Sequence, residues 1–245
     1  MAAGAALALA LASLALLLHG ARFGYWPRPP SVAPGTVRHR WFARLALRAV
    51  VHFGAVAVLL LAVLGRLDAI AKFPPELLPA SAVAVAWIGQ PGWPPLAAGA
   101  LGGVVIAALL ERRGRRVTIG DLRAVMPTRH AELGWGVLLA IVAGVTEELF
   151  FRLLLPLLLA IVSGSALLGF AGATAAFGYA HRYQGWRGVV ATVIAGVVLA
   201  LVYLVSGRLW PAMLVHAAID LNGLVLRPVL AGKLRLAHPD PSPRT

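Results

Sequence analysis

The chain has 245 residues, of which 60% are hydrophobic and only 13% charged, a composition that excludes an ordinary soluble domain and predicts an integral membrane protein. Its formal net charge of +13 would suggest nucleic acid in a soluble protein, but the basic residues fall between apolar runs. We therefore interpret them as topology determinants that face lipid headgroups, and expect no nucleic-acid partner. The absence of cysteine excludes disulfides, thiolate metal sites and a cysteine nucleophile.

Apolar runs long enough to cross a bilayer core of roughly 30 Å recur along the chain. They cover 2–18, 47–64, 77–110, 133–161, 165–180, 189–206 and 209–226. The first run lacks the basic region that precedes a signal peptide's apolar core, so we expect a retained helix. The third run is interrupted at 90–95 by Gln-Pro-Gly-Trp-Pro-Pro, so it forms either one span with an interfacial helix or two short helices.

Loop charge favours a single crossing by the third run. Basic clusters precede the second run and follow the third; they comprise Arg22, Arg28, Arg38, Arg40 and Arg44, and then Arg112, Arg113, Arg115, Arg116 and Arg123. If both clusters are cytoplasmic, an even number of crossings must separate them. The remaining loop and tail cations fit the same frame; they are Arg182, Arg187, Lys233, Arg235 and Arg244.

These patterns predict an all-α polytopic membrane protein with about seven to eight transmembrane helices. The higher number applies if the third run, or the fourth at Pro156, is split. We expect a bacterial plasma (inner) membrane, with the N-terminus outside and the C-terminus in the cytoplasm. We expect the chain to divide into three parts: N-terminal helices and basic loops at 1–130, a core at 131–230 and a flexible basic tail at 231–245. The last residues of the tail, 237–245, contain three prolines, which is typical of disorder.

Two adjacent glutamates and an arginine interrupt the fourth run. Each ionised side chain at bilayer depth costs roughly 2.5 to 3.5 kcal/mol on insertion scales, so three together predict a functional or structural role. Glu148 and Arg152 are four positions apart and share a helical face, which predicts a structural ion pair. Glu147, about 100° around the helix, is left as the candidate reactive carboxylate. The alternative is a buried ionic knot that only stabilises helix packing.

Two further clusters bring imidazoles to membrane depth. Phe177 and His181 end one run, where the simplest interpretation is a packing phenylalanine and an interfacial histidine. His216 and Asp220 share a face of the last run, where they could simply hydrogen-bond to each other. Ionisable groups on three apolar helices usually face one another or a water-filled cavity.

One glutamate and two histidines with a supporting acid can activate water for hydrolysis. Glu147, His181 and His216 could also complete a zinc site that leaves one position open for water. The chain contains neither an H-E-x-x-H motif nor a G-x-S-x-G nucleophile elbow. Ser163 and Ser165 are predicted to be helix-end residues.

The ordered motifs E-E-x-x-x-R, F-x-x-x-H and H-x-x-x-D resemble those of the CAAX protease and bacteriocin-processing family, also called CPBP or Abi. This family of intramembrane proteases includes the CAAX prenyl endopeptidase, and the resemblance covers about 133–226. It implies that Glu147 activates water, that Arg152 supports Glu148, and that His181 and His216 line the same site. The family commonly has asparagine where this chain has Asp220, and often glycine where it has Leu153. Asp220 could donate to an oxyanion only if protonated, so a metal-ligand role or a role in orienting His216 is equally plausible.

The resemblance implies an endopeptidase, glutamic or metallo-dependent, that acts on a membrane-associated or prenylated CAAX-like peptide. Its partners would be a peptide or lipidated-protein substrate and membrane lipid. Its cofactor would be none or a divalent metal such as zinc, and we favour metal-free chemistry. The other function that we consider is a proton-coupled transporter or non-catalytic scaffold that uses the same buried polar cluster, although no internal repeat typical of transporters is evident.

Overall fold

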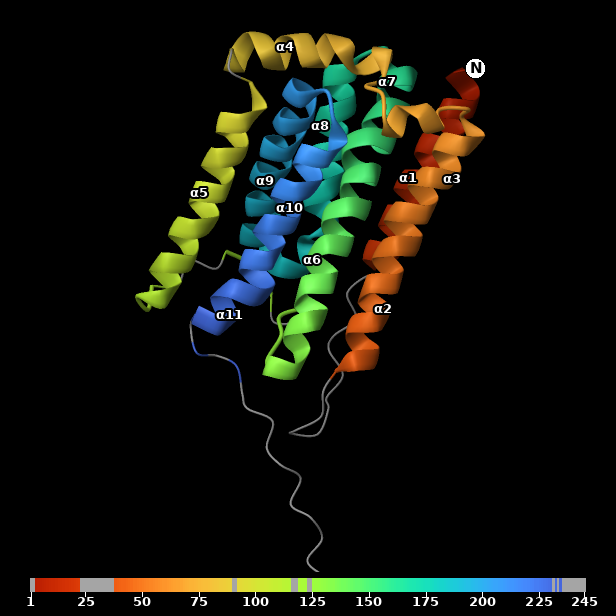
Figure 1. Cartoon of the computed structure of the whole chain (residues 1–245). Helices are drawn as coiled ribbons and strands as arrows, with labels where there is room; N and C mark the ends of the chain where they lie inside the picture. The colour runs from red at the N-terminus through yellow and green to blue at the C-terminus, as the bar shows by residue number, and fades with distance from the viewer. Residues whose placement is uncertain are drawn as a thin grey trace, which may run out of the picture.

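The computed structural model describes residues 3–22, 38–89, 92–115, 119–122, 125–230, 232 and 234. All regular secondary structure within these ranges is helical, as predicted (Figure 1). Several predicted features lie outside the described residues, namely the 237–245 tail, Gln90, Pro91, Arg28, Arg116, Arg123, Lys233, Arg235 and Arg244.

Long helices that run along one common direction make up most of the molecule (Figure 1). Their bounds are α1 Ala3–Arg22, α2 His39–Ala49, α3 Val56–Val63, α5 Trp93–Arg112, α6 Leu133–Glu148, α7 Leu155–Ser163, α8 Ala166–Ala180, α9 Gly185–Ser206, α10 Leu209–Leu221 and α11 Arg227–Leu230. Short 3₁₀ turns connect some of them, at Leu67–Ile70, Pro75–Leu77, His130–Glu132 and Arg182–Gln184.

Three pairs of these helices are continuous through a π-helical turn. The turns are η1 Val50–Ala55 between α2 and α3, η5 Leu149–Leu154 between α6 and α7, and η7 Asn222–Leu226 between α10 and α11. Pro156 follows η5 and has no backbone N–H to donate to the preceding turn, which accounts for the wider turn at this position. The helix therefore continues through Pro156 instead of splitting there.

The interrupted third run contains one long helix and one short one. α4, Leu78–Ile88, lies across one end of the bundle, roughly perpendicular to the other helices, and α5 then runs along the bundle (Figure 1). Among the described residues, four helices are long and apolar enough to cross a membrane; they are His39–Val63, Trp93–Arg112, Arg182–Ser206 and Leu209–Leu230. α5 is one of the four and α4 is not, which agrees with a single crossing by this run.

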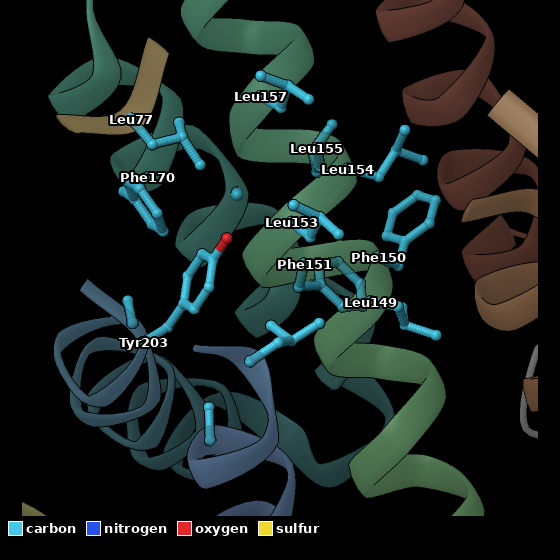
Figure 2. Close-up of a cluster of buried hydrophobic side chains, with 14 of the residues drawn as sticks. Leu77, Leu149, Phe150, Phe151, Leu153, Leu154, Leu155, Leu157, Phe170 and Tyr203 are labelled. Atoms are coloured by element: carbon cyan, nitrogen blue, oxygen red, sulfur yellow. The ribbon is translucent and has the colours of Figure 1, made fainter. Parts of the chain in front are cut away.

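The apolar core occupies the half of the bundle nearer to α4. Leu149–Leu158 supplies its centre, and α8 and α9 close it with residues that include Phe170 and Tyr203 (Figure 2). A tight reversal joins α7 to α8: Gly164 adopts a left-handed conformation with φ of 70°, and the side chain of Ser165 caps α8 by accepting from the N–H of Leu168. Ser163 and Ser165 are thus helix-end residues, as predicted.

A buried ion pair holds the starts of α2 and α6 together. The Arg38 guanidinium lies 2.7 Å from Glu132 Oε2 and also donates to the backbone oxygen of Met126, at 2.9 Å. Glu132 further accepts from the backbone N–H of Thr128, at 2.9 Å. Burial alone would raise the pKa of Glu132, but these hydrogen bonds and the Arg38 charge lower it to about 2. The sequence analysis did not identify this pair.

Candidate active site

Glu147 and Glu148 are the last two residues of α6, next to Leu149–Leu158 at the centre of the apolar core. Glu147 is 3% exposed and Glu148 fully buried, and Arg152 in the π-helical turn is 2% exposed. The first turn of η5 follows Glu148 without a break, so both carboxylates are held on a rigid helix. Their two side chains nevertheless have different neighbours.

Glu148 is shared between two partners. Arg152 Nη1 lies 3.0 Å from Glu148 Oε1, and His216 Nδ1 lies 2.7 Å from the same oxygen. A carboxylate oxygen accepts, so the short contact shows Nδ1–H of His216 donating to Glu148. Glu148 therefore orients the His216 ring in addition to pairing with Arg152.

Glu147 faces both imidazoles. Its Oε2 atom lies 4.0 Å from His181 Nε2 and 4.0 Å from His216 Nε2, and within the described structure it has no hydrogen-bond partner. His181 Nδ1 lies 2.9 Å from the backbone oxygen of Phe177, which can only accept, so the proton is on Nδ1. Both histidines thus commit Nδ1 to an acceptor and direct Nε2 towards Glu147.

Phe177 packs against three of the charged or imidazole side chains. Its ring lies 4.2 Å from Arg152 Cζ, and its centroid lies 4.8 Å from that of His181 and 5.8 Å from that of His216. The arginine therefore has a cation–π partner as well as a carboxylate. Phe177 is a packing residue, as predicted, and what it packs against is the polar cluster.

Asp220 lies on the more open side of His216. Its Oδ2 atom is 3.7 Å from His216 Nε2, and its side chain is 33% exposed. The nitrogen that it approaches is the one that faces Glu147. The hydrogen bond that orients His216 is made to Glu148, on the other nitrogen.

A cavity of about 280 Å³ opens beside these groups. It is bounded by α2, α6, α9, α10 and the segment around Leu122, and its walls are mainly apolar. All four predicted catalytic residues line it, namely Glu147, His181, His216 and Asp220. Three helices that are distant in sequence therefore bring the predicted residues to one hollow.

Residues 129–222 match a family model, described as type II CAAX prenyl endopeptidase Rce1-like. This segment is similar to the Rce1-like family. The match confirms the resemblance drawn from the three motifs, and it supports a CAAX-type intramembrane protease in general terms. No significant match was found among curated proteins or among solved structures.

Sequence reasoning missed Asn222, a buried polar residue of the cavity in the Rce1-like segment. Asn222 lies in η7, is 5% exposed and lines the cavity, and within the described structure its Oδ1 atom has no hydrogen-bond partner. A nearby signal existed, because the family's asparagine would stand two positions earlier, where this chain has Asp220. Arg227, just beyond the Rce1-like segment, also lines the cavity and was likewise not predicted.

The predicted zinc ligands are close together but do not form a metal site. Among the described residues, no group of three or more His, Cys, Asp or Glu side chains is arranged to hold a metal ion. Ligands that share a tetrahedral zinc ion lie about 3.3 Å apart, whereas Glu147 Oε2 lies 4.0 Å from each Nε2. In this geometry Glu147, His181 and His216 do not fit a bound zinc ion.

Proposed function

We propose that this protein is an intramembrane endopeptidase in which Glu147 activates water to hydrolyse a peptide bond of a membrane-associated or prenylated, CAAX-like substrate. One observation carries the proposal: Glu147 Oε2 lies 4.0 Å from the Nε2 atoms of both His181 and His216. Such separations are too long for direct hydrogen bonds and suit a bridging water.

The protonation states of His181 and His216 suit a water molecule between their Nε2 atoms and Glu147. His181, with its proton on Nδ1, can accept one water proton at Nε2, and Glu147 can accept the other. His216 has Glu148 on Nδ1 and faces Glu147 and Asp220 with Nε2. As an imidazolium it would donate Nε2–H to the water oxygen, which leaves one lone pair for attack.

The reaction then needs only the groups of this chain and water. Glu147 takes a proton as the water oxygen adds to the scissile carbonyl carbon, and the Nε2–H of an imidazolium His216 stabilises the oxyanion. Glu147 returns the proton to the leaving amine as the C–N bond breaks. The product acid keeps the second proton of the water until it passes to the amine, which gives a carboxylate and an ammonium group. Glu148 and Arg152 act as positioning residues. Glu148 accepts the Nδ1–H of His216 and so orients its ring, and Arg152 offsets the negative charge of Glu148.

The test is cleavage of a farnesylated CAAX peptide, labelled with a fluorophore and a quencher on either side of the scissile bond. Glu147→Gln keeps the shape of the side chain but removes the base, so kcat should fall by roughly 100- to 10,000-fold. Asp68→Asn, which changes an exposed carboxylate that does not line the cavity, is the matched control and should cleave normally.

Retained cleavage by a folded Glu147→Gln protein would contradict the assignment. If the wild-type protein cleaves no such peptide, the termini of cellular peptides can be compared between cells with wild-type protein and with Glu147→Ala. Proton flux in liposomes that depends on Glu147, without any difference in peptide termini, would instead support the alternative function of a proton-coupled transporter.

A further inference from the structure

A second cavity lies at the end of the bundle where α4 crosses it. Its volume is about 450 Å³, and two stretches of chain line it: residues 69–73 of the segment that joins α3 to α4, and Tyr203, 207–210 and Met213 of α9, α10 and the turn between them. Figure 1 places the α3–α4 segment beside α4, away from α11. None of the four predicted catalytic residues lines this second cavity, so the proposed hydrolysis leaves it without a role.

The walls of the second cavity carry two cations and no acid. Lys72 comes from the α3–α4 segment and Arg208 from the turn before α10, and none of the described lining residues is Asp or Glu. Within the part of the chain that the structure describes, neither cation has an ion-pair partner. The nearby Glu76 carboxylate is occupied by Arg66, whose Nη2 atom lies 2.7 Å from Glu76 Oε2. The second cavity therefore attracts anions, because its charge has no internal counter-charge.

The start of α10 adds backbone donors to the same wall. Arg208 precedes the helix, and its side chain makes no capping hydrogen bond. Leu209 and Trp210 each have a backbone N–H in the first turn, where no helical acceptor is within reach. The helix dipole adds partial positive charge at this point. A guanidinium and an ammonium beside free N–H groups suit the oxygens of a phosphate.

Tryptophan side chains place the second cavity at the depth of the lipid headgroups. Trp210 lines it and is 48% exposed, and its ring meets that of Trp93 edge to face, with centroids 5.5 Å apart. Tryptophan is enriched where acyl chains meet the headgroups. Leu214 lies one turn beyond Trp210 on α10 and is also exposed, so an apolar face continues from the cavity along the helix.

We propose that the second cavity binds the headgroup of an anionic phospholipid, with Lys72 and Arg208 on the phosphate and an acyl chain along Trp210 and Leu214. Two unpaired cations favour a headgroup with net negative charge, and the exposed apolar face suits an acyl chain. Phosphatidylglycerol meets both requirements, whereas phosphatidylcholine brings a cation of its own. The site does not depend on the proposed hydrolysis, because it shares no residue with the catalytic cavity.

Native mass spectrometry of the purified full chain in detergent can measure the affinity for each lipid. Phosphatidylglycerol should bind more tightly than phosphatidylcholine. Lys72→Gln and Arg208→Gln should each weaken phosphatidylglycerol binding by roughly 5-fold, as expected for one cation near a headgroup. Lys72→Arg keeps the charge and should keep the affinity. Arg113→Gln, an exposed cation that does not line the second cavity, is the matched control and should bind as wild type does.

A variant that keeps both cations separates a shaped cavity from a diffuse attraction between charges. Ala71 lines the second cavity and is exposed, so Ala71→Trp should fill the space without disturbing the core. Its affinity for phosphatidylglycerol should fall although Lys72 and Arg208 are unchanged. Ala62→Trp, at an exposed position of α3 outside the cavity, is the control and should bind normally. Undiminished binding by Ala71→Trp would overturn the proposal.

The phosphate could also come from a small soluble molecule, which a thermal shift distinguishes. Phosphatidylglycerol should raise the thermal midpoint of the wild-type protein in detergent, and this rise should be smaller for Ala71→Trp. Glycerol 1-phosphate at the same concentration lacks acyl chains and should leave the midpoint unchanged. An equal rise with glycerol 1-phosphate, or equal affinities for phosphatidylglycerol and phosphatidylcholine, would overturn the assignment to an anionic lipid.

Discussion

Glu147 and Glu148 have identical side chains and adjacent positions, yet the helix gives them different neighbours. Glu148 is enclosed by Arg152 and His216, which occupy its Oε1 atom. Glu147 points at two Nε2 atoms across gaps of 4.0 Å. A helical step of about 100° therefore separates a positioning carboxylate from one that can exchange a proton with water.

Whether cleavage needs a metal ion depends on the distances between individual side chains. Because Glu147 lies too far from each histidine nitrogen to share a tetrahedral zinc with them, we expect cleavage to be independent of metal. Activity of purified protein should be unchanged after dialysis against 1,10-phenanthroline or EDTA. Loss of activity that added zinc restores would show that the site rearranges around a metal.

Glu132 makes a pH-dependent contribution to stability. Its pKa is lowered from an ordinary 4.5 to about 2 in the folded protein, so ionised Glu132 stabilises the folded state relative to the unfolded state. The contribution is complete above about pH 4.5 and is lost as the pH falls to about 2.

Glu132→Gln should therefore lower the thermal midpoint in detergent at pH 7, and the difference from wild type should shrink between pH 4.5 and pH 2. Asp68→Asn serves as the exposed control and should show little difference at any pH. A gap for Glu132→Gln that persists unchanged at pH 2 would argue against this linkage.

At the scale of elements, the site depends on how closely α6 approaches α10. A Cβ atom added at Gly144 would lie 2.9 Å from the backbone nitrogen of Ala217 and 3.0 Å from the backbone oxygen of Met213. Both contacts are with backbone, so the helices must move apart. Gly144 lies one turn before Glu147, and Ala217 is next to His216.

We predict that Gly144→Ala lowers both kcat and the thermal midpoint, since overpacking of this kind costs about 1–3 kcal/mol. Gly134→Ala on the same helix is the matched control, because a Cβ atom there meets nothing within 4 Å. Equal cleavage rates for the two variants would mean that the helix spacing at Gly144 does not set the catalytic geometry.

The elements themselves were largely predictable. Runs of apolar residues predicted the helices, and the interruption at 90–95 predicted the break between α4 and α5. The outcome at Pro156 was not decided by sequence, because a proline can end a helix or be absorbed by a wider turn. The packing of Leu149–Leu158 in the core favours the continuous helix seen here.

At the scale of the whole molecule, most of the described basic segments lie at one end of the bundle. The starts of α2 and α6 and the ends of α5 and α11 lie there. The segment that joins α3 to α4, which carries Arg66 and Lys72, lies at the other end (Figure 1). We propose that the first end, onto which the cavity opens, is cytoplasmic, in accord with the positive-inside rule.

Single cysteines test this orientation directly, because the chain has none of its own. Arg113→Cys should be blocked only by a thiol reagent that crosses the membrane, and Lys72→Cys by an impermeant one added outside. Both residues are exposed, so labelling should not depend on unfolding. The reverse pattern would place the cavity on the outer side.

The sequence by itself determined the class of the molecule and the identity of the residues at its centre. Apolar runs, basic loops and three ordered motifs carry that information locally, because bilayer insertion and helical spacing act over short stretches of chain. Only the tertiary structure decided which atoms face one another. That Glu148 serves both Arg152 and His216, and that Asn222 and Arg227 line the cavity, depends on how distant helices are rotated and packed, which no local pattern specifies.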